Sequence, residues 1–159
     1  MTAHSLRLAL LLVTPAAFGE TSDLSYESFV DSDKRIKCLY GYAAQKTGDH
    51  ASALKIFEDC VERWNDVYSM IWLAQMYESG IGVPLSLEKA AALIKRGAEQ
   101  PDTTAYVSLA RYHWGVALAE GRGVAVDRDA ARRWLQSASS GGQTEADEYL
   151  LRLDAAVPR

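Results

Sequence analysis

The chain has 159 residues, enough for one domain with a hydrophobic core and too few for two comfortably. Its composition, 48% hydrophobic and 24% charged, is that of an ordinary globular protein. The formal net charge is −4 at pH 7, and no stripe of lysine and arginine is present. We therefore expect no nucleic-acid partner.

Residues 1–19 are predicted to be a cleaved export signal, with a disordered apolar tail as the alternative. Arg7 supplies a positive charge, LALLLV follows at residues 8–13, and the small residues around Gly19 suit cleavage before Glu20. The apolar run is too short to span a bilayer, so no membrane insertion is expected. The mature protein is predicted to be periplasmic or secreted. Residues 20–33 are interpreted as a linker or a short helix.

The two cysteines, Cys38 and Cys60, are predicted to form a disulfide, because an even count is typical of exported chains. They lie in two helical stretches joined by the turn signal Thr47-Gly48-Asp49. An antiparallel hairpin would bring them together, and two buried thiols are the alternative. A zinc site needs closer spacing or more ligands, so no metal is expected.

One stretch of the sequence occurs twice. GIGVPLSLEKAA begins at Gly80, and GRGVAVDRDAA begins at Gly121. In both copies the glycines, which include Gly82 and Gly123, suit a helix end and a tight loop. Ser86 and Asp127 then have the type and position of helix N-caps. Both loops are therefore predicted to connect two helices. A phosphate-binding loop would need a preceding strand and a following Lys-Ser/Thr, which neither copy has.

The repeated pattern, LAQMYESGIGVPLSLEKAAALIKRGAEQ and GVALAEGRGVAVDRDAARRWLQSASSGG, resembles the Sel1-like repeat, a relative of the tetratricopeptide repeat with a longer loop. The first hairpin, with Gly41, Gly48 and Phe57, looks more like a plain tetratricopeptide unit. The resemblance covers roughly residues 34–142. It implies an all-α, right-handed α-solenoid of about three antiparallel hairpins within residues 34–155. A helix over residues 143–153 is expected to cap the open end.

The resemblance implies a noncatalytic interaction or scaffold module of the exported compartment, without a cofactor. The first helix of each unit is expected to line a concave groove for a partner protein or peptide. Each aromatic candidate could equally belong to the core, and Trp64, Trp72 and Trp134 are interpreted as packing residues first. The groove candidates are Tyr42, Gln45, Tyr68, Ile71, Gln75, Glu78, Leu109, Tyr112, His113 and Val116.

The alternative function is a cell-wall or β-lactam hydrolase, proposed for some cysteine-rich relatives. The stretch SLEK, from Ser86 to Lys89, matches the Ser-x-x-Lys motif of serine β-lactamases. However, Ser86 aligns with Asp127, which can replace a cap but not a nucleophile, and the companion motifs are missing. A position of Ser86 in a cleft facing Lys89 and a second base would favour the enzyme.

Overall fold

The computed structural model describes residues 26–155, and within this range the chain forms eight α-helices and no strand. The predicted all-α fold is confirmed. The predicted export signal lies outside the described residues. The helices are α1 (Glu27–Val30), α2 (Lys37–Thr47), α3 (His50–Trp64), α4 (Val67–Ser79), α5 (Leu87–Ala98), α6 (Ala105–Glu120), α7 (Arg128–Ser140) and α8 (Thr144–Ala155).

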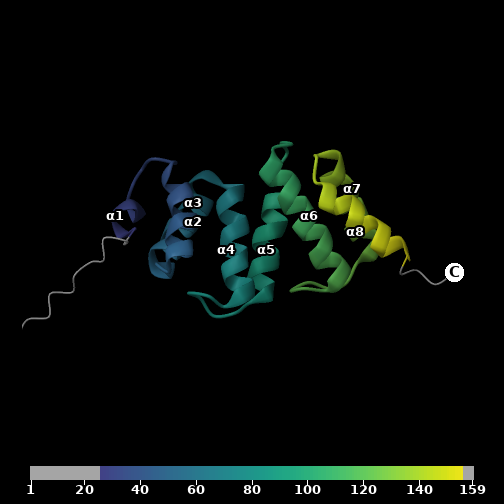
Figure 1. Ribbon diagram of the computed structural model, residues 1–159, viewed down its shortest axis with the longest axis horizontal. Coiled ribbons are helices and arrows are strands. Elements are labelled where there is room, and N and C mark those ends of the chain that lie inside the picture. Colours follow the sequence, from purple (N-terminus) through teal and green to yellow (C-terminus); the bar gives the residue numbers. More distant parts are fainter. Residues whose placement is uncertain (1–25, 156–159) are drawn as a thin grey trace, which may run out of the picture.

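The helices follow one another along the long axis of the molecule in chain order (Figure 1). Each contacts its neighbours in sequence, so α2/α3, α4/α5 and α6/α7 form three helix hairpins that stack side by side. The last helix, α8, packs on α7 and α6 at the end of the stack. This arrangement is an α-solenoid, as the sequence predicted. The segment before the first hairpin contains the one-turn helix α1, which contacts α2 and α3.

The connections from α2 to α3 and from α3 to α4 are short turns. Gly48 ends α2 in the left-handed conformation, and the side chain of Asp49 accepts a hydrogen bond from the backbone N–H of Ser52 to begin α3. Between α3 and α4, Asn65 adopts a φ of 50°, and Asp66 caps α4 through the backbone N–H of Ser69. Asparagine tolerates this conformation better than most residues, so the chain reverses without a glycine.

The two longer loops have the same hydrogen bonds at equivalent positions. The backbone N–H of Ser86 bonds to the carbonyl of Tyr77, and that of Asp127 bonds to the carbonyl of Leu118. The side chain of Ser86 caps α5, and that of Asp127 caps α7. These bonds close each loop onto the end of the preceding helix and set where the second helix of the unit begins.

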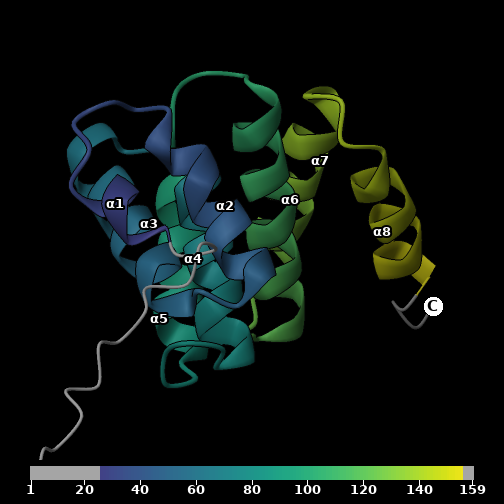
Figure 2. The same cartoon turned by 60° about the vertical axis from the view of Figure 1, so that its left-hand side comes forward.

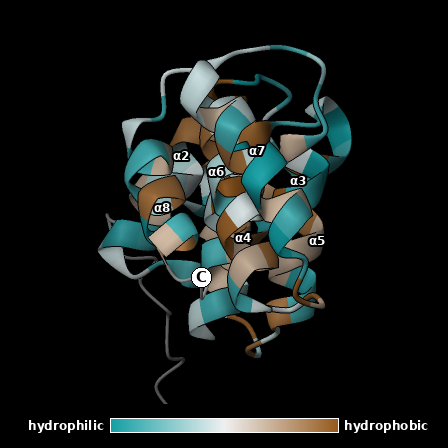
Figure 3. Ribbon diagram, turned by 90° about the vertical axis from the view of Figure 1, so that its right-hand side faces the viewer, coloured by the Kyte–Doolittle hydropathy of each residue, from teal (hydrophilic) through white to brown (hydrophobic). Residues whose placement is uncertain are grey.

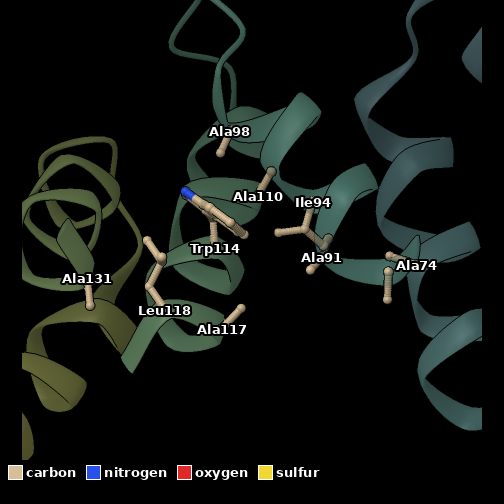
Figure 4. Close-up of a cluster of buried hydrophobic side chains, with 10 residues drawn as sticks. Ala74, Ala91, Ile94, Ala98, Ala110, Trp114, Ala117, Leu118 and Ala131 are labelled. Carbon is tan, nitrogen blue, oxygen red and sulfur yellow. The ribbon is translucent and has the colours of Figure 1, made fainter. Parts of the chain in front are cut away.

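Small side chains let the helices of the second and third units approach closely. Around the buried Trp114 of α6, the core consists largely of alanines from α4, α5, α6 and α7, together with Ile94 and Leu118 (Figure 4). Trp114 fills the volume that its small neighbours leave. Hydrophobic and hydrophilic residues alternate around the helices, as expected of elements that bury one face (Figure 3).

The first hairpin is held by a disulfide and a buried ion pair. Cys38 on α2 and Cys60 on α3 form the predicted disulfide, with their Cα atoms 5.9 Å apart. Next to the disulfide, the side chain of Lys37 is only 1% exposed. Its Nζ atom lies 2.7 Å from a carboxylate oxygen of Asp59 and also donates a hydrogen bond to the carbonyl of Val30. Lys37 therefore fastens the segment containing α1 to the hairpin. The sequence pattern gave no sign of this burial.

Candidate functional site

The first helices of the three hairpins form one continuous surface. α2 contacts α4, and α4 contacts α6. In Figure 2, α6 lies to the right of α2, whereas the second helices α3 and α5 lie to its left. We call the surface made by α2, α4 and α6 the first-helix face. It is the surface on which the groove was predicted.

Four aromatic rings from these helices form a row across the first-helix face. Ring centroids are separated by 4.6 Å between Tyr42 and Trp72, 6.1 Å between Trp72 and Tyr68, and 5.1 Å between Tyr68 and Tyr106. Each spacing lies within or close to the range of favourable aromatic pairs. Tyr106 is 47% exposed, and Tyr42 is also exposed. The aromatic row therefore presents ring surface to solvent across all three hairpins.

Charge and burial adjust the chemistry of this row. The Nζ atom of Lys46 lies 5.2 Å from the ring centroid of Tyr42 and 5.3 Å from that of Trp72, within cation–π distance of both. Burial, together with the proximity of Tyr106, raises the pKa of Tyr68 to about 12. The phenol of Tyr68 therefore stays protonated at physiological pH and can act as a hydrogen-bond donor.

A large open cleft of about 770 Å³ lies at the end of the row where Tyr68 and Tyr106 meet. Its wall on α2 includes Ile36, just before the helix, and Leu39, which are 55% and 52% exposed. Arg35, also in the wall, is mostly exposed and lies 3.0 Å from Asp66. This large cleft combines apolar surface with one ion pair, a mixture typical of binding sites.

Two smaller clefts also open on the first-helix face, and they share Gln75. One, of about 170 Å³, lies between α4 and α6; we call it the apolar pocket, and it is lined by Ile71, Trp72, Ala74, Gln75, Glu78, Ile94, Leu109 and His113. The other, of about 320 Å³, lies between α2 and α4; we call it the donor cleft, and it is lined by Gln45, Lys46, His50, Gln75, Ser79 and Ile81.

His113 is neutral at the edge of the apolar pocket. Burial lowers its pKa, and the nearby charge of Arg122 lowers it further. Arg122 itself lies 3.2 Å from Glu120 and 3.9 Å from Glu78. The imidazole therefore offers one donor and one acceptor at neutral pH instead of a positive charge.

Eight of the ten predicted groove residues lie in the aromatic row or line a cleft of this face. They are Tyr42, Gln45, Tyr68, Ile71, Gln75, Glu78, Leu109 and His113. That they bind a partner stays a prediction. Tyr112 and Val116 do not belong with them.

Val116 is a correction to the sequence analysis. It is only 7% exposed and packs in a core cluster with Leu135 of α7 and with Ala146 and Leu153 of α8. Tyr112 is half-buried against the same cluster. The reason is the position of α8, which covers this part of α6. The first-helix face therefore ends before it reaches Tyr112 and Val116.

Several residues of the site were missed by sequence reasoning. Trp72 was interpreted as a packing residue, yet it stands between Tyr42 and Tyr68 in the aromatic row. The spacing of Tyr68 and Trp72, four residues apart in a helix, could have indicated a shared face. Tyr106 and Lys46 gave no comparable signal, because their roles depend on contacts between different units.

Ser86 has the geometry of a cap. Its hydroxyl oxygen accepts a hydrogen bond from the backbone N–H of Lys89 and lies 3.2 Å from a carboxylate oxygen of Glu88. The ammonium of Lys89 lies over the ring of Tyr77, 5.1 Å from its centroid. Ser86 lines none of the three clefts described above. The observation that would favour a hydrolase is therefore not met at this residue.

Within residues 26–155, no group of three His, Cys, Asp or Glu side chains is arranged to hold a metal ion. None of the helices in the same range combines the length and the apolar character that crossing a membrane requires.

Comparison with known proteins identifies the repeats. The Sel1 repeat model matches residues 67–102 and 108–143, which correspond to the second and third hairpins. A crystal structure of a Sel1 repeat protein from Oxalobacter formigenes is similar, with a TM-score of 0.59 and 24% identity. The likeness covers 69% of this chain and 42% of that one, so this chain spans less than half of that protein, and at this identity it shows the fold alone. No curated protein matches significantly. The chain therefore contains two Sel1 repeats, one in α4/α5 and one in α6/α7.

Proposed function

We propose that the protein is a noncatalytic interaction module that binds a partner protein or peptide on its first-helix face. Sel1 repeats generally mediate protein–protein interactions, which supports the class of function. The single observation that carries the proposal for this chain is the aromatic row of Tyr42, Trp72, Tyr68 and Tyr106. It crosses all three hairpins and is flanked by clefts.

The row is suited to a binding role for physical reasons. Tyrosine and tryptophan supply a large contact area at a small cost in conformational entropy, and they are enriched where binding energy is concentrated. The rings of Tyr42 and Tyr106 contact Trp72 and Tyr68 of the neighbouring unit, and the rest of their surface stays exposed to solvent. The exposed rings of Tyr42 and Tyr106 are therefore available to a partner.

We further propose that the module works in an exported compartment, periplasmic or secreted. The disulfide between Cys38 and Cys60 is compatible with an oxidising environment. The predicted export signal at residues 1–19 supports the same location. Both features can be checked by finding where the mature chain accumulates in its own cell and whether its N-terminus begins near residue 20.

The binding role is tested by comparing two exposed apolar side chains. Tyr106 belongs to the aromatic row, whereas Leu85, 63% exposed, lies in the loop between α4 and α5. The amount of partner that co-purifies with tagged Tyr106→Ala is expected to fall about tenfold or more, as for a central aromatic contact. Leu85→Ala is expected to retain the partner like the unchanged protein. Equal retention by both variants would overturn the assignment of the face.

A further inference from the structure

The donor cleft is lined by hydrogen-bond donors and by no carboxylate. Lys46 contributes an ammonium group, Gln45 and Gln75 contribute amides, and Ser79 contributes a hydroxyl. Among the ion pairs of residues 26–155, none involves Lys46, whose ammonium lies over the rings of Tyr42 and Trp72. The cleft is therefore electrostatically suited to an anion.

Two polar atoms in the wall of the cleft have no partner within the chain. The side-chain oxygen of Gln45 and the Nδ1 atom of His50 are both buried without a hydrogen bond. Such atoms are costly unless something satisfies them. The hydroxyl of Ser79 is different, because it lies 2.8 Å from the carbonyl of Gln75 on its own helix. The cleft thus has hydrogen-bonding capacity that the chain does not use, although the Gln45 oxygen is an acceptor and does not itself favour an anion.

Two carboxylates, those of Asp49 and Glu78, are adjacent in sequence to residues of the donor cleft, but neither lines it. Asp49, next to His50, already accepts hydrogen bonds from the backbone N–H groups of Tyr26 and Ser52. Glu78 lies on the wall of the neighbouring apolar pocket, where Arg122 is within 3.9 Å of it. Asp49 therefore has hydrogen-bond partners and Glu78 an ion-pair partner within the chain, and both keep their negative charge.

The apolar pocket adjoins the donor cleft at Gln75, which lines both. Ile71 and Ala74 of α4, Ile94 of α5 and Leu109 of α6 give it an aliphatic lining. A volume of about 170 Å³ is smaller than a typical small-molecule site and suits a single side chain. A ligand that fills both spaces must carry an aliphatic group and an anionic group close together.

Resting on the proposed function, we propose that the first-helix face captures the C-terminal residue of a partner peptide. The terminal carboxylate lies in the donor cleft against Lys46 and Gln75, and the aliphatic side chain of the same residue fills the apolar pocket. A C-terminal residue carries both groups on one Cα atom, which matches two spaces that share one wall. Charge-assisted hydrogen bonds to the carboxylate supply the selectivity for a free C-terminus.

The test uses three synthetic peptides as probes. The first is acetyl-Gly-Gly-Ser-Leu with a free C-terminal carboxylate, the second is the same peptide with a C-terminal amide, and the third is the amidated peptide acetyl-Gly-Gly-Asp-Leu. Binding to the full chain is followed by NMR titration. The free-acid peptide is expected to bind about tenfold or more tightly than either amide and to shift the side-chain amide signals of Gln45 and Gln75. Equal binding of the three probes, no binding, or tighter binding of the aspartate peptide overturns the proposal.

Two lysine variants locate the carboxylate. Lys46→Met, which removes the ammonium group and keeps most of the apolar stem, is expected to reduce the affinity for the free-acid peptide to that of the amide. Lys55→Met, at an exposed position of α3, the second helix of the first hairpin, is expected to leave the affinities for the free-acid and amide peptides unchanged. A selectivity that survives Lys46→Met overturns the site. If the peptide probes fail but Tyr106→Ala still reduces the amount of partner that co-purifies, only the C-terminal capture is contradicted. If Tyr106→Ala retains the partner as well as Leu85→Ala does, the proposed function itself is contradicted.

Discussion

A Cβ atom added to Gly123 would overlap the carbonyl oxygen of Leu87. Gly123 lies in the loop of the third unit, and Leu87 is the first residue of α5 in the unit before it. The same relationship occurs one unit earlier, where a Cβ atom on Gly82 would lie 2.6 Å from the Cβ atom of His50 at the start of α3. Each repeat loop therefore docks against the start of the preceding unit's second helix, and glycine permits the close approach.

Gly123→Ala is expected to destabilise the fold more than Gly142→Ala. Both glycines have a positive φ, 67° and 92°, so both variants incur a backbone strain of about 1 kcal/mol. Only Gly123 faces an obstruction, because a Cβ atom on Gly142 would meet nothing within 4 Å. The free energy of unfolding from urea denaturation should therefore fall by at least about 1 kcal/mol more for Gly123→Ala. Equal losses would show that the loop does not need the close approach.

Removal of the disulfide is expected to destabilise the first hairpin. The bond joins residues 22 positions apart, and closing a loop of that length contributes roughly 2–4 kcal/mol in the chain-entropy account. The non-reduced protein should show no free thiol after unfolding, and reduction should lower Tm by several degrees. Thiol titration in denaturant and a thermal melt with and without a reductant measure the two effects. Two titratable thiols in the non-reduced protein would contradict the bond.

Lys37→Met is expected to lower the free energy of unfolding by about 1–3 kcal/mol. It leaves the carboxylate of Asp59 without its 2.7 Å partner and the carbonyl of Val30 without its donor. The matched control is Lys95→Met, since Lys95 is exposed and forms only a 3.6 Å pair with Glu99. That surface pair should contribute less than about 1 kcal/mol. Comparable losses in the two variants would show that burial gives Lys37 no special role.

The same ion pair predicts a loss of stability in acid. Burial alone would raise the pKa of Asp59, but the hydrogen bond and charge of Lys37, with the charge of Arg63, hold it below its ordinary value of 3.8. A carboxyl with a lowered pKa in the folded state stabilises the fold at neutral pH, and this contribution is lost as the pH falls below about 4. Asp59→Asn should therefore show a smaller decrease in unfolding free energy between pH 6 and pH 2. An unchanged pH profile would contradict this role.

Tyr112→Ala and Gln75→Ala are expected to behave differently. Tyr112 is half-buried against the cluster that joins α6, α7 and α8, so its truncation should lower the unfolding free energy by roughly 1–3 kcal/mol. Gln75 is exposed on the first-helix face, and its truncation should change stability by less than about 0.5 kcal/mol. Thermal or urea denaturation of the two variants decides the matter. If Tyr112→Ala leaves the free energy of unfolding unchanged, Tyr112 is a surface residue and again a candidate for the groove.

Local features of the fold could be predicted because each depends on residues that lie close together in the sequence. The glycines at Gly80 and Gly121, the caps at Ser86 and Asp127 and the paired alanines recur in register, so the repeat itself indicates two equivalent hairpins. The pairing of Cys38 and Cys60 followed from the count of two and the hairpin between them. In all these cases the signal lies within one unit.

Features that depend on contacts between units could not be predicted in the same way. The burial of Lys37 depends on the docking of the segment that contains Val30, and helix periodicity says nothing about that docking. Val116 is covered because α8 packs across α6, whereas the corresponding Gln75 of the second unit has no such cover. Equivalent positions in a repeat thus acquire different environments at the end of the stack.

Site-specific cross-linking shows directly whether a partner binds on the first-helix face. A photo-cross-linking amino acid is placed at Tyr42 or Tyr106 on the first-helix face, and in matched variants at Lys55 of α3 or Arg133 of α7, which are exposed on second helices. After irradiation in the compartment where the mature chain accumulates, we expect one recurrent cross-linked partner at Tyr42 and Tyr106 and none at Lys55 or Arg133. A partner that cross-links equally well from the second helices, or only from them, would contradict binding on the first-helix face.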